Sequence, residues 1–436
     1  MPSLVRKRES WPINKKTGKP VKKPHVAWLA QVPIGKKPNG TTRYLRKTFE
    51  TRDAAVSWAN EKKMERDSGG VVEPAKMTVW QYLDHWLKTA VKPSLRANTA
   101  ESYRNVAENY LKPQLEDVRL EDLSPLHVQA AYAEIQKAGH SSRTVRYAHS
   151  VLHNALDQAV AWRMLRTNPA GAGIKLPKHT KKEIAPLAAE EAADFVLEAR
   201  SHRLGPLFEV ALVTGMRPGE LLGLQWVDVD LDGGSIRVCR TLTQTAEGCT
   251  LNEPKTKRGR RAIPIPAETV ATLRAWHATQ ASERMKAGEL WKGEPRPRDG
   301  FVFTGALGRP LDQRNVVNRG FRPLLDRYRK AQLEARDLAD AGEPVERIAE
   351  TLGRAADRVR RWVEADRAVP NGVRMYDLRH TCATLMLLAG VNPKVVSERL
   401  GHASVVLTLD TYSHVLPNMQ HDATERLAEV VYGERA

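Results

Sequence analysis

Residues 376–412 read YDLRHTCATLMLLAGVNPKVVSERLGHASVVLTLDTY, and this stretch concentrates side chains that can do chemistry. Arg379 and His380 lie in an apolar helical segment, a Leu-Gly-His triplet ends at His402, and Tyr412 follows. A site that cleaves a phosphodiester needs an arginine, an imidazole and a nucleophile such as a phenol. The stretch therefore predicts phosphodiester chemistry, with its groups delivered by consecutive short helices.

The order of these groups resembles the C-terminal signature of the tyrosine recombinases, or phage integrases. In that family an arginine box, a Leu-Gly-His box and a tyrosine follow one another. One position departs from the pattern, because Tyr376 stands where most members have a histidine, three residues before the arginine. The resemblance implies a mainly α fold with small β segments: a β-sheet-plus-helix N-terminal module, a helical core-binding (SAM-like) domain and a mixed α+β catalytic domain.

Length and charge fit this resemblance. A chain of 436 residues is too long for one hydrophobic core, so we expect two or three domains. The net charge of +18 favours a polyanionic partner, although a ribosome-associated or membrane-surface protein would also be basic. No apolar run reaches the ~18 residues that span a bilayer. The N-terminus, MPSLVRKRES, lacks the apolar segment of a signal peptide, so we expect a cytoplasmic protein without a membrane partner.

The three cysteines, Cys239, Cys249 and Cys382, show no paired spacing of the kind that zinc ligands have. We therefore expect no metal site and no disulfide framework.

Residues 1–70 predict a small basic module. Residues 25–34 alternate as a strand does, Asn39-Gly40 indicates a turn, and residues 41–49 predict a second strand before a helix capped by Thr51. A sheet followed by one helix resembles the arm-type DNA-binding module of many integrases. The candidate DNA contacts are Arg43, Arg46 and Lys47; a solvated charged sheet face is the alternative.

Residues 76–172 predict a helical domain, because apolar residues recur at helical spacing. The first stripe consists of Val79, Tyr82, Leu83, Trp86 and Leu87. The stretch resembles the core-binding domain of integrases, and on that analogy Arg143 and Arg146 would meet DNA. Either arginine could equally belong to a solvated face. Residues 171–182 form a basic, Pro- and Gly-containing linker.

The catalytic domain is expected over residues 183–436. Its motif Thr-Gly-X-Arg-X-X-Glu matches the first arginine box of the recombinases, with Arg217 as a phosphate clamp and Glu220 as a supporting carboxylate. An arginine at a helix start is unfavourable for the helix dipole, so another interaction must favour it there. A purely structural Arg217–Glu220 pair is the alternative.

A lysine is expected from the segment EPKTKRGRRAIPIP, which begins at Glu253 and resembles the hairpin that carries the family's catalytic lysine. Lys255 fits the commoner Pro-Lys-Thr pattern, and Lys257 is the alternative, on the same side if the strand is regular. The following arginines are expected to hold backbone phosphates: Arg258, Arg260 and Arg261.

Residues 333–366 predict a helical insertion that the family's minimal pattern lacks. Its segment IAETLGRAADRVRRWV is similar to the helix-turn-helix of resolvases and homeodomain-like repressors. The arginines on or near the recognition helix are Arg354, Arg358, Arg360 and Arg361. We expect a DNA-contacting or subunit-contacting microdomain, with a plain helical hairpin as the alternative.

The resemblance implies a mechanism. Arg217 and Arg379 would neutralise the non-bridging oxygens, and Tyr412 would attack phosphorus to form a 3′-phosphotyrosyl bond without ATP or metal. Lys255 would protonate the leaving 5′-oxygen and His402 would hydrogen-bond the phosphate. Tyr376 could donate a hydrogen bond but is a poor base, and adjacent His380 is counted only as supporting.

The expected function is therefore a site-specific recombinase that integrates or excises a mobile element at double-stranded attachment sites. The family implies a homotetramer on DNA, with a host DNA-bending protein and an excisionase as further partners. Two alternatives stay open: a catalytically impaired DNA-binding relative, for which Tyr376 is the only hint, and a Xer-like or transposon recombinase. A type IB topoisomerase-like enzyme would share the chemistry but not the three-part layout.

Overall fold

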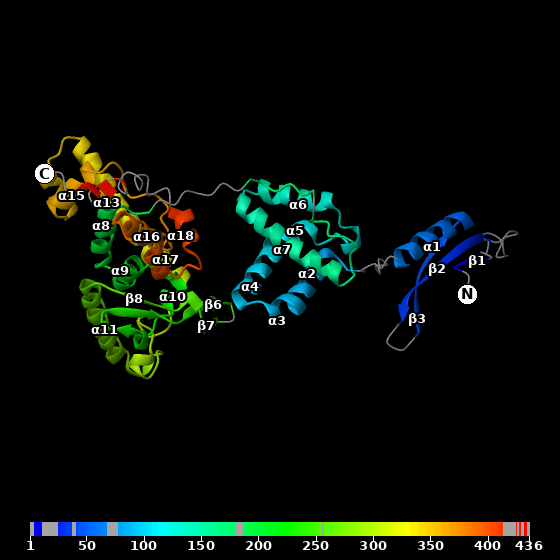
Figure 1. Cartoon of the computed structure of the whole chain (residues 1–436), viewed down its shortest axis with the longest axis horizontal. Helices are drawn as coiled ribbons and strands as arrows, with labels where there is room; N and C mark the ends of the chain where they lie inside the picture. Colours follow the sequence, from blue (N-terminus) through cyan, green and yellow to red (C-terminus); the bar gives the residue numbers. More distant parts are fainter. Residues whose placement is uncertain are drawn as a thin grey trace, which may run out of the picture. The chain divides into compact units, whose positions relative to one another are not determined.

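The computed structural model describes residues 4–10, 25–36, 41–67, 77–171, 173–178, 186–246, 248–254 and 257–412, with short pieces at 424, 427–428 and 431–433. The chain divides into two compact units, Met1–Lys181 and Lys182–Ala436 (Figure 1). Within the described residues, no helix combines the length and the apolar character needed to cross a bilayer. Helices predominate and the sheets are small, so the predicted fold class is confirmed.

The N-terminal part of the first unit is an antiparallel sheet of three strands in the order β1-β2-β3, with helix α1 packed on it. The elements are β1 (Val5–Ser10), β2 (His25–Lys36), β3 (Thr42–Phe49) and α1 (Arg52–Asp67). Its core contains Ala30 and Val32 from β2 and Ala55 and Ala59 from α1. The sequence VRKRES of β1 has no alternation, so this strand was not predicted. The expected turn at Asn39-Gly40 lies outside the described residues.

The remainder of the first unit is helical. Its elements are α2 (Val79–Trp86), α3 (Lys92–Ser94), α4 (Ala97–Val106), α5 (Lys112–Leu115), α6 (Pro125–Lys137) and α7 (Ser142–Ala161). The predicted apolar stripe of α2 is buried in a core that also takes the inner faces of α6 and α7. Side chains of Thr78, Ser124 and Ser141 cap α2, α6 and α7 by accepting backbone N–H bonds.

Two π-helical turns, η1 (Leu87–Val91) and η2 (Ala107–Leu111), interrupt these helices, and each precedes a Lys-Pro pair. The lysine N–H of each pair reaches back five residues, from Lys92 to Leu87 and from Lys112 to Ala107. Proline has no N–H and its ring crowds the carbonyl four residues earlier, which a wider turn relieves.

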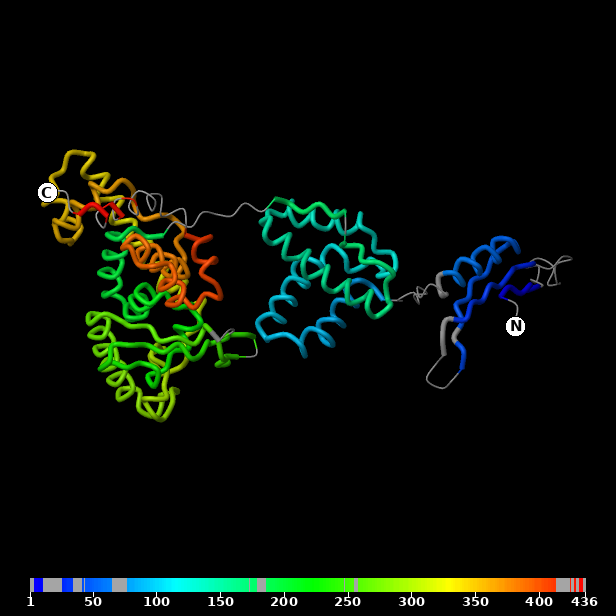
Figure 2. Tube along the Cα trace, in the orientation of Figure 1, coloured from blue at the N-terminus to red at the C-terminus, as the bar shows by residue number. Residues whose placement is uncertain are grey.

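The second unit is built around helix α9 (Gly205–Thr214), most of whose residues are buried. Helix α16 (Asp377–Leu388) packs on α9, and α17 (Pro393–Leu400) packs on α16 and on α18 (Val405–Tyr412), as the traces show (Figure 2). Three other helices also contact α9: α8 (Ala189–Ala199), α10 (Pro218–Leu222) and α11 (Ala267–Ala287).

Two small sheets flank these helices. The first pairs β4 (Val229–Asp230), β5 (Ser235–Val238) and β8 (Arg261–Pro264) antiparallel, with Ile236 opposite Ile263. The second is the hairpin of β6 (Thr241–Thr245) and β7 (Gly248–Asn252). Lys257 opens a 3-10 turn, Lys257–Gly259, so the condition of a regular strand through this position is not met.

The insertion is formed by the end of α13 (Arg322–Asp340) together with α14 (Val345–Leu352) and α15 (Ala356–Glu364), so it continues a helix that begins before residue 333. Arg358 is buried and pairs with Asp194 and Glu198 of α8 at 3.2 and 2.9 Å. The Trp362 indole also donates to Asp194. Because these contacts attach α15 to the domain core, Arg358 is not free to contact DNA, and any such role for the insertion stays a prediction.

Candidate active site

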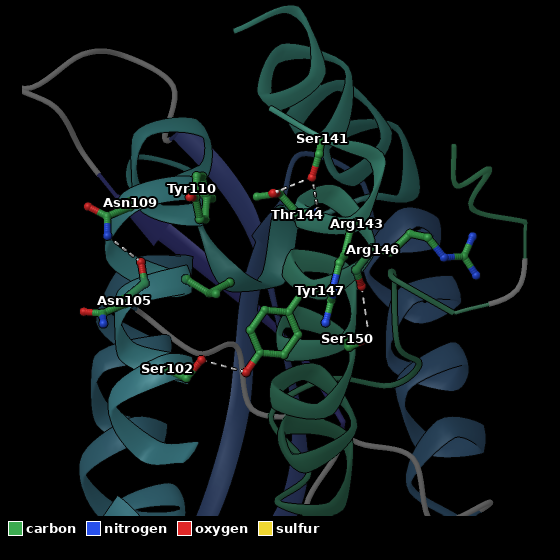
Figure 3. Close-up of a pocket in the computed structure, with 11 residues that line it drawn as sticks. Ser102, Asn105, Asn109, Tyr110, Ser141, Arg143, Thr144, Arg146, Tyr147 and Ser150 are labelled. Atoms are coloured by element: carbon green, nitrogen blue, oxygen red, sulfur yellow. Dashed lines mark hydrogen bonds between the residues drawn. The ribbon is translucent and has the colours of Figure 1, made fainter. Parts of the chain in front are cut away.

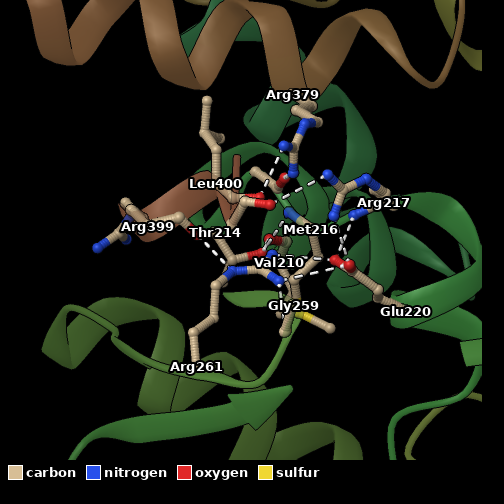
Figure 4. Close-up of polar contacts among 12 residues, drawn as sticks. Val210, Thr214, Met216, Arg217, Glu220, Gly259, Arg261, Arg379, Arg399 and Leu400 are labelled. Atoms are coloured by element: carbon tan, nitrogen blue, oxygen red, sulfur yellow. Dashed lines mark hydrogen bonds and ion pairs between the residues drawn. The ribbon is translucent and has the colours of Figure 1, made fainter. Parts of the chain in front are cut away.

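Arg379 is the residue around which the site is assembled. Its side chain is 2% exposed and donates to the carbonyl oxygens of Gly215 and Leu400, both at 2.7 Å. These carbonyls lie at the C-terminal ends of α9 and α17, so the arginine of α16 joins the two helix ends (Figure 4). The negative end of a helix dipole favours a cation, which helps to offset the cost of burying the charge.

Glu220 holds two further arginines in place. Its carboxylate is 3% exposed and accepts hydrogen bonds from Arg217 Nη1 at 2.8 Å, the Arg217 backbone N–H at 3.0 Å and Arg261 Nη2 at 2.9 Å. Burial alone would raise the pKa of Glu220, but the hydrogen bonds and charges of Arg261 and Arg217 outweigh it and lower that pKa. The ionised carboxylate therefore fixes Arg217 at the start of α10 despite the helix dipole.

Two left-handed glycines shape the turns that carry these contacts. Gly215 ends α9 with φ of +62° and Gly401 ends α17 with φ of +66°. A Cβ on Gly215 would lie 2.6 Å from Leu400 Cδ2, and one on Gly401 would lie 3.0 Å from Arg261 Nη1. Both positions therefore require glycine for backbone conformation and for space.

The site carries more positive than negative charge. The carboxylate of Glu220 pairs with Arg217 and Arg261, and it acts on Arg379 through its charge alone. Burial, and then the charge of Arg217, lowers the pKa of Arg379 to about 10, so this guanidinium stays protonated at neutral pH. Burial and these three arginines lower the pKa of His402 to about 4. A neutral imidazole beside uncompensated guanidinium groups is suited to receive an anion such as a phosphodiester.

Tyr412 ends α18 and points into the domain. Its side chain is 2% exposed, and its hydroxyl lies 2.7 Å from Nδ1 of His380. Burial raises the pKa of Tyr412, and the charge of Arg379 acts in the opposite direction. The structure therefore brings four of the predicted catalytic groups together: Arg217, Arg379, His402 and Tyr412. Arg379 lies close enough to change the pKa values of both Tyr412 and His402, and Arg217 acts on His402 as well.

Tyr376 lies at the start of α16 and is 40% exposed. Its ring meets the His380 ring edge to face, with 5.3 Å between centroids. His402 is oriented by a different contact, in which its Nδ1 lies 2.8 Å from Thr408 Oγ1. Tyr376 therefore borders the imidazole that contacts Tyr412 and supports its orientation.

The predicted lysine cannot be placed, because Lys255 and the side chain of Lys257 lie outside the described residues. The nearby arginines have different surroundings. Arg258 is exposed and donates to the Ala403 carbonyl, and exposed Arg260 pairs with Glu253, whereas the side chain of Arg261 is 7% exposed. These residues border a cavity of about 220 Å³ that also includes Gly401 and His402. Arg261 acts within the protein, and contact of Arg258 and Arg260 with phosphates stays a prediction.

The first unit carries the remaining predicted DNA contacts. Arg46 and Lys47 are exposed on β3, and the side chain of Arg43 lies outside the described residues. Arg143 and Arg146 line a polar groove of about 840 Å³ between α4, η2 and α7. In this groove the hydroxyls of Ser102 and Tyr147 lie 2.9 Å apart (Figure 3). None of the described residues that line the groove carries a carboxylate, which suits a polyanion.

Comparison with known proteins identifies this arrangement. The model of the phage integrase family matches residues 180–419, which is more than half of the chain. The chain belongs to the phage integrase family. It is therefore a tyrosine-type site-specific recombinase, as its C-terminal signature predicted. A second model, the N-terminal SAM-like domain of phage integrases, matches residues 78–135 within the helical part of the first unit.

Relatives span nearly the whole integrase chain. A tyrosine recombinase XerC-like protein of Caldanaerobacter subterraneus is 28% identical over 92% of this chain and 95% of its own length. An integrase of Saccharopolyspora erythraea is 23% identical over 93% and 94%. A solved structure of the Tn1549 transposon integrase, in complex with a circular intermediate DNA, shares the fold with a TM-score of 0.61 at 20% identity, covering 81% of this chain and all of that chain.

Sequence reasoning missed several residues that hold the site together. The backbone carbonyl of Arg399 accepts from Arg261 Nε at 2.5 Å, and Arg399 Nη2 donates to the Val213 carbonyl at 2.9 Å. Thr408 orients His402. Contacts to backbone carbonyls depend on the tertiary fold, so no sequence pattern marks them.

Proposed function

We propose that this recombinase integrates or excises a mobile genetic element by breaking and rejoining double-stranded DNA at its attachment sites. The observation that supports the proposal best is the convergence of Arg217, Arg379, His402 and Tyr412 in one positively charged site. A dianionic transition state is stabilised by fixed cations that require little rearrangement during the reaction.

Each residue has a proposed role. Arg217 and Arg379 bind the non-bridging oxygens of the scissile phosphate. His402, neutral before DNA binds, donates a hydrogen bond from its free ring nitrogen. Tyr412 attacks phosphorus and forms a 3′-phosphotyrosyl bond, and Lys255 or Lys257 protonates the 5′-oxygen that leaves. Because the bond energy is kept in the phosphotyrosyl link, rejoining needs no ATP, and the chemistry proposed here uses no metal.

The remaining parts of the chain are proposed to position the DNA. Residues 1–70 form an arm-type module, residues 76–172 form the core-binding domain, and residues 183–436 form the catalytic domain. The exposed cations of β3 and the polar groove of the helical part support DNA contact by the first two. We propose a homotetramer on two duplexes, acting in the cytoplasm, with a host DNA-bending protein and an excisionase as partners.

A recombination assay in cells tests this function. A reporter plasmid would carry the DNA that flanks this protein's gene, arranged as two candidate attachment sites. Expression of the chain should produce recombinant junctions, which sequencing of amplified products detects. The Tyr412→Phe variant lacks the nucleophilic oxygen and should produce none. Wild-type chain that binds these sites but yields no junctions would contradict the proposal.

A catalytically impaired DNA-binding relative is the second candidate, because Tyr376 replaces the usual histidine. If that replacement silences the enzyme, Tyr376→His should create junctions that the wild-type chain does not make. Junction formation by the wild-type chain would exclude this candidate.

A further inference from the structure

His380 is the side chain in contact with the hydroxyl of Tyr412. The two residues come from different helices, α16 and α18, and the Nδ1 to Oη distance is 2.7 Å. Their rings lie 5.7 Å apart between centroids. His380 also follows Arg379 directly in sequence, so the imidazole is held on the same helical turn as a proposed phosphate-binding group. A proton acceptor at hydrogen-bond distance from a nucleophile is the arrangement that general-base catalysis requires.

We propose that His380 is the general base that accepts the Tyr412 proton, a function that Tyr376 is poorly suited to perform. The proposal rests on the proposed function, because it requires Tyr412 to be the nucleophile. As the Tyr412 oxygen forms its bond to phosphorus, its proton passes to Nδ1 of His380. The bond from phosphorus to the 5′-oxygen breaks, and this oxygen is protonated by Lys255 or Lys257. In rejoining, the 5′-hydroxyl attacks phosphorus and gives its proton back to the lysine, the bond from phosphorus to the Tyr412 oxygen breaks, and His380 returns the proton to Tyr412.

The protonation state of His380 suits this role. Burial lowers its pKa; Arg374 and Arg379 lower it further, and Asp377 acts in the opposite direction. The net decrease leaves the imidazole neutral at pH 7, so one ring nitrogen can accept a proton. The ionisable groups that face it are Arg374, Tyr376, Asp377, Arg379, His402 and Tyr412.

The burial of Tyr412 makes an acceptor in direct contact important. Because burial raises the pKa of its phenol, a free phenolate is a minor species in this site. The proton must therefore leave while the oxygen–phosphorus bond forms, which requires the acceptor to be in place beforehand. Within this pair of helices His380 meets that requirement at 2.7 Å.

Tyr376 orients His380 and does not itself accept the Tyr412 proton. A phenol has a reference pKa of about 10 and accepts a proton poorly at neutral pH. Its ring edge packs against the imidazole, which restricts the rotation of His380 toward solvent. Tyr376 is therefore a positioning residue in this account.

Single-turnover cleavage of a nicked duplex by the full chain, measured from pH 5 to 8.5, tests the proposal. The wild-type rate should rise with pH and level off once His380 is neutral. His380→Gln keeps a hydrogen-bond acceptor but takes up no proton. Its cleavage rate should therefore be about 10²- to 10⁴-fold lower, and the rising limb of the pH–rate profile should disappear. Tyr376→Phe keeps the aromatic ring and should keep the rising limb, whatever its absolute rate.

A rescue experiment distinguishes loss of the general base from misfolding of the variant. His380→Ala should bind the duplex as the wild-type chain does, and added imidazole should restore cleavage in proportion to its neutral fraction. A His380→Gln variant that cleaves at the wild-type rate, or more slowly with the limb intact, overturns the proposal, as does failure of imidazole to rescue a DNA-binding His380→Ala. If the wild-type chain forms no Tyr412 adduct, the proposed recombinase function itself is wrong. This result distinguishes failure of the proposed function from failure of the His380 proposal alone.

Discussion

Replacing Glu220 with alanine should destabilise the second unit more than any change at an exposed charge. The carboxylate accepts two hydrogen bonds from Arg217 and holds Arg261 Nη2 at 2.9 Å. A hydrogen bond to a charged group contributes roughly 1.5–3 kcal/mol. The Arg217 side chain is partly exposed, so solvent screening reduces its share, whereas Arg261 is nearly buried and would lose its carboxylate partner.

The expected loss for Glu220→Ala is therefore about 3–5 kcal/mol in the free energy of unfolding, the range for breaking a buried ion pair. Glu220→Gln keeps acceptors for the Arg217 backbone N–H and one arginine, so it should lose less. Because the folded-state pKa of Glu220 is lowered, the stabilisation is present above its unfolded-state pKa and is lost as pH falls through the folded-state value. The difference between Glu220→Ala and wild type should accordingly shrink in acid.

Urea unfolding of the full chain, followed by circular dichroism in a pH series, measures both effects. Cleavage should fall in parallel, because Arg217 loses the contact that fixes its orientation. A free energy of unfolding for Glu220→Ala within about 0.5 kcal/mol of wild type, the range of surface substitutions, would show that this carboxylate does not organise the site.

Three further predictions follow from single residues. Burial and the arginine charges lower the pKa of His402, and the phosphate of bound DNA offsets these charges, so DNA binding should add a proton to His402. Calorimetry in buffers of different ionisation enthalpy should detect this proton uptake between pH 5 and 7, and binding without uptake would contradict the prediction. Gly401→Ala should lower the free energy of unfolding by about 1–2 kcal/mol because of its left-handed conformation, with an additional steric cost. Gly342→Ala, which is also left-handed but lies in open space, should show the conformational loss without the steric cost when both variants are unfolded in urea. Arg358→Ala should destabilise the chain by about 3 kcal/mol and exposed Arg360→Ala by less than about 0.5 kcal/mol; equal losses would contradict the buried role of Arg358.

Periodicity and caps predicted most of the local structure. The stripe of α2 and the start of α1 after Thr51 appear in the structure as expected, because spacing and capping are local properties of the chain. Strand β1 was missed because its charged residues show no alternation, and its pairing with β2 depends on a partner far along the chain. The insertion was expected to contact DNA or another subunit, yet the Arg358 contact with Asp194 joins segments that the sequence separates widely.

In the candidate site, too, the sequence predicted which residues belong together, whereas their contacts depend on the tertiary fold. Motif order predicted that Arg217, Arg379, His402 and Tyr412 belong together, but it could not give the geometry. The contact between His380 and Tyr412 arises because α16 and α18 both pack on α17, which no spacing rule specifies. Arg261 was expected on DNA because basic runs usually face solvent, whereas here it is buried against Glu220.

The most direct test of the account is covalent capture of the nucleophile. Nicked duplexes from DNA flanking the gene would be incubated with the full chain without metal or ATP, and the products separated on a denaturing gel. The expected product is a protein–DNA adduct that peptide mass mapping assigns to Tyr412 and that Tyr412→Phe does not form. An adduct at another residue, or undiminished cleavage by Tyr412→Phe, would contradict it.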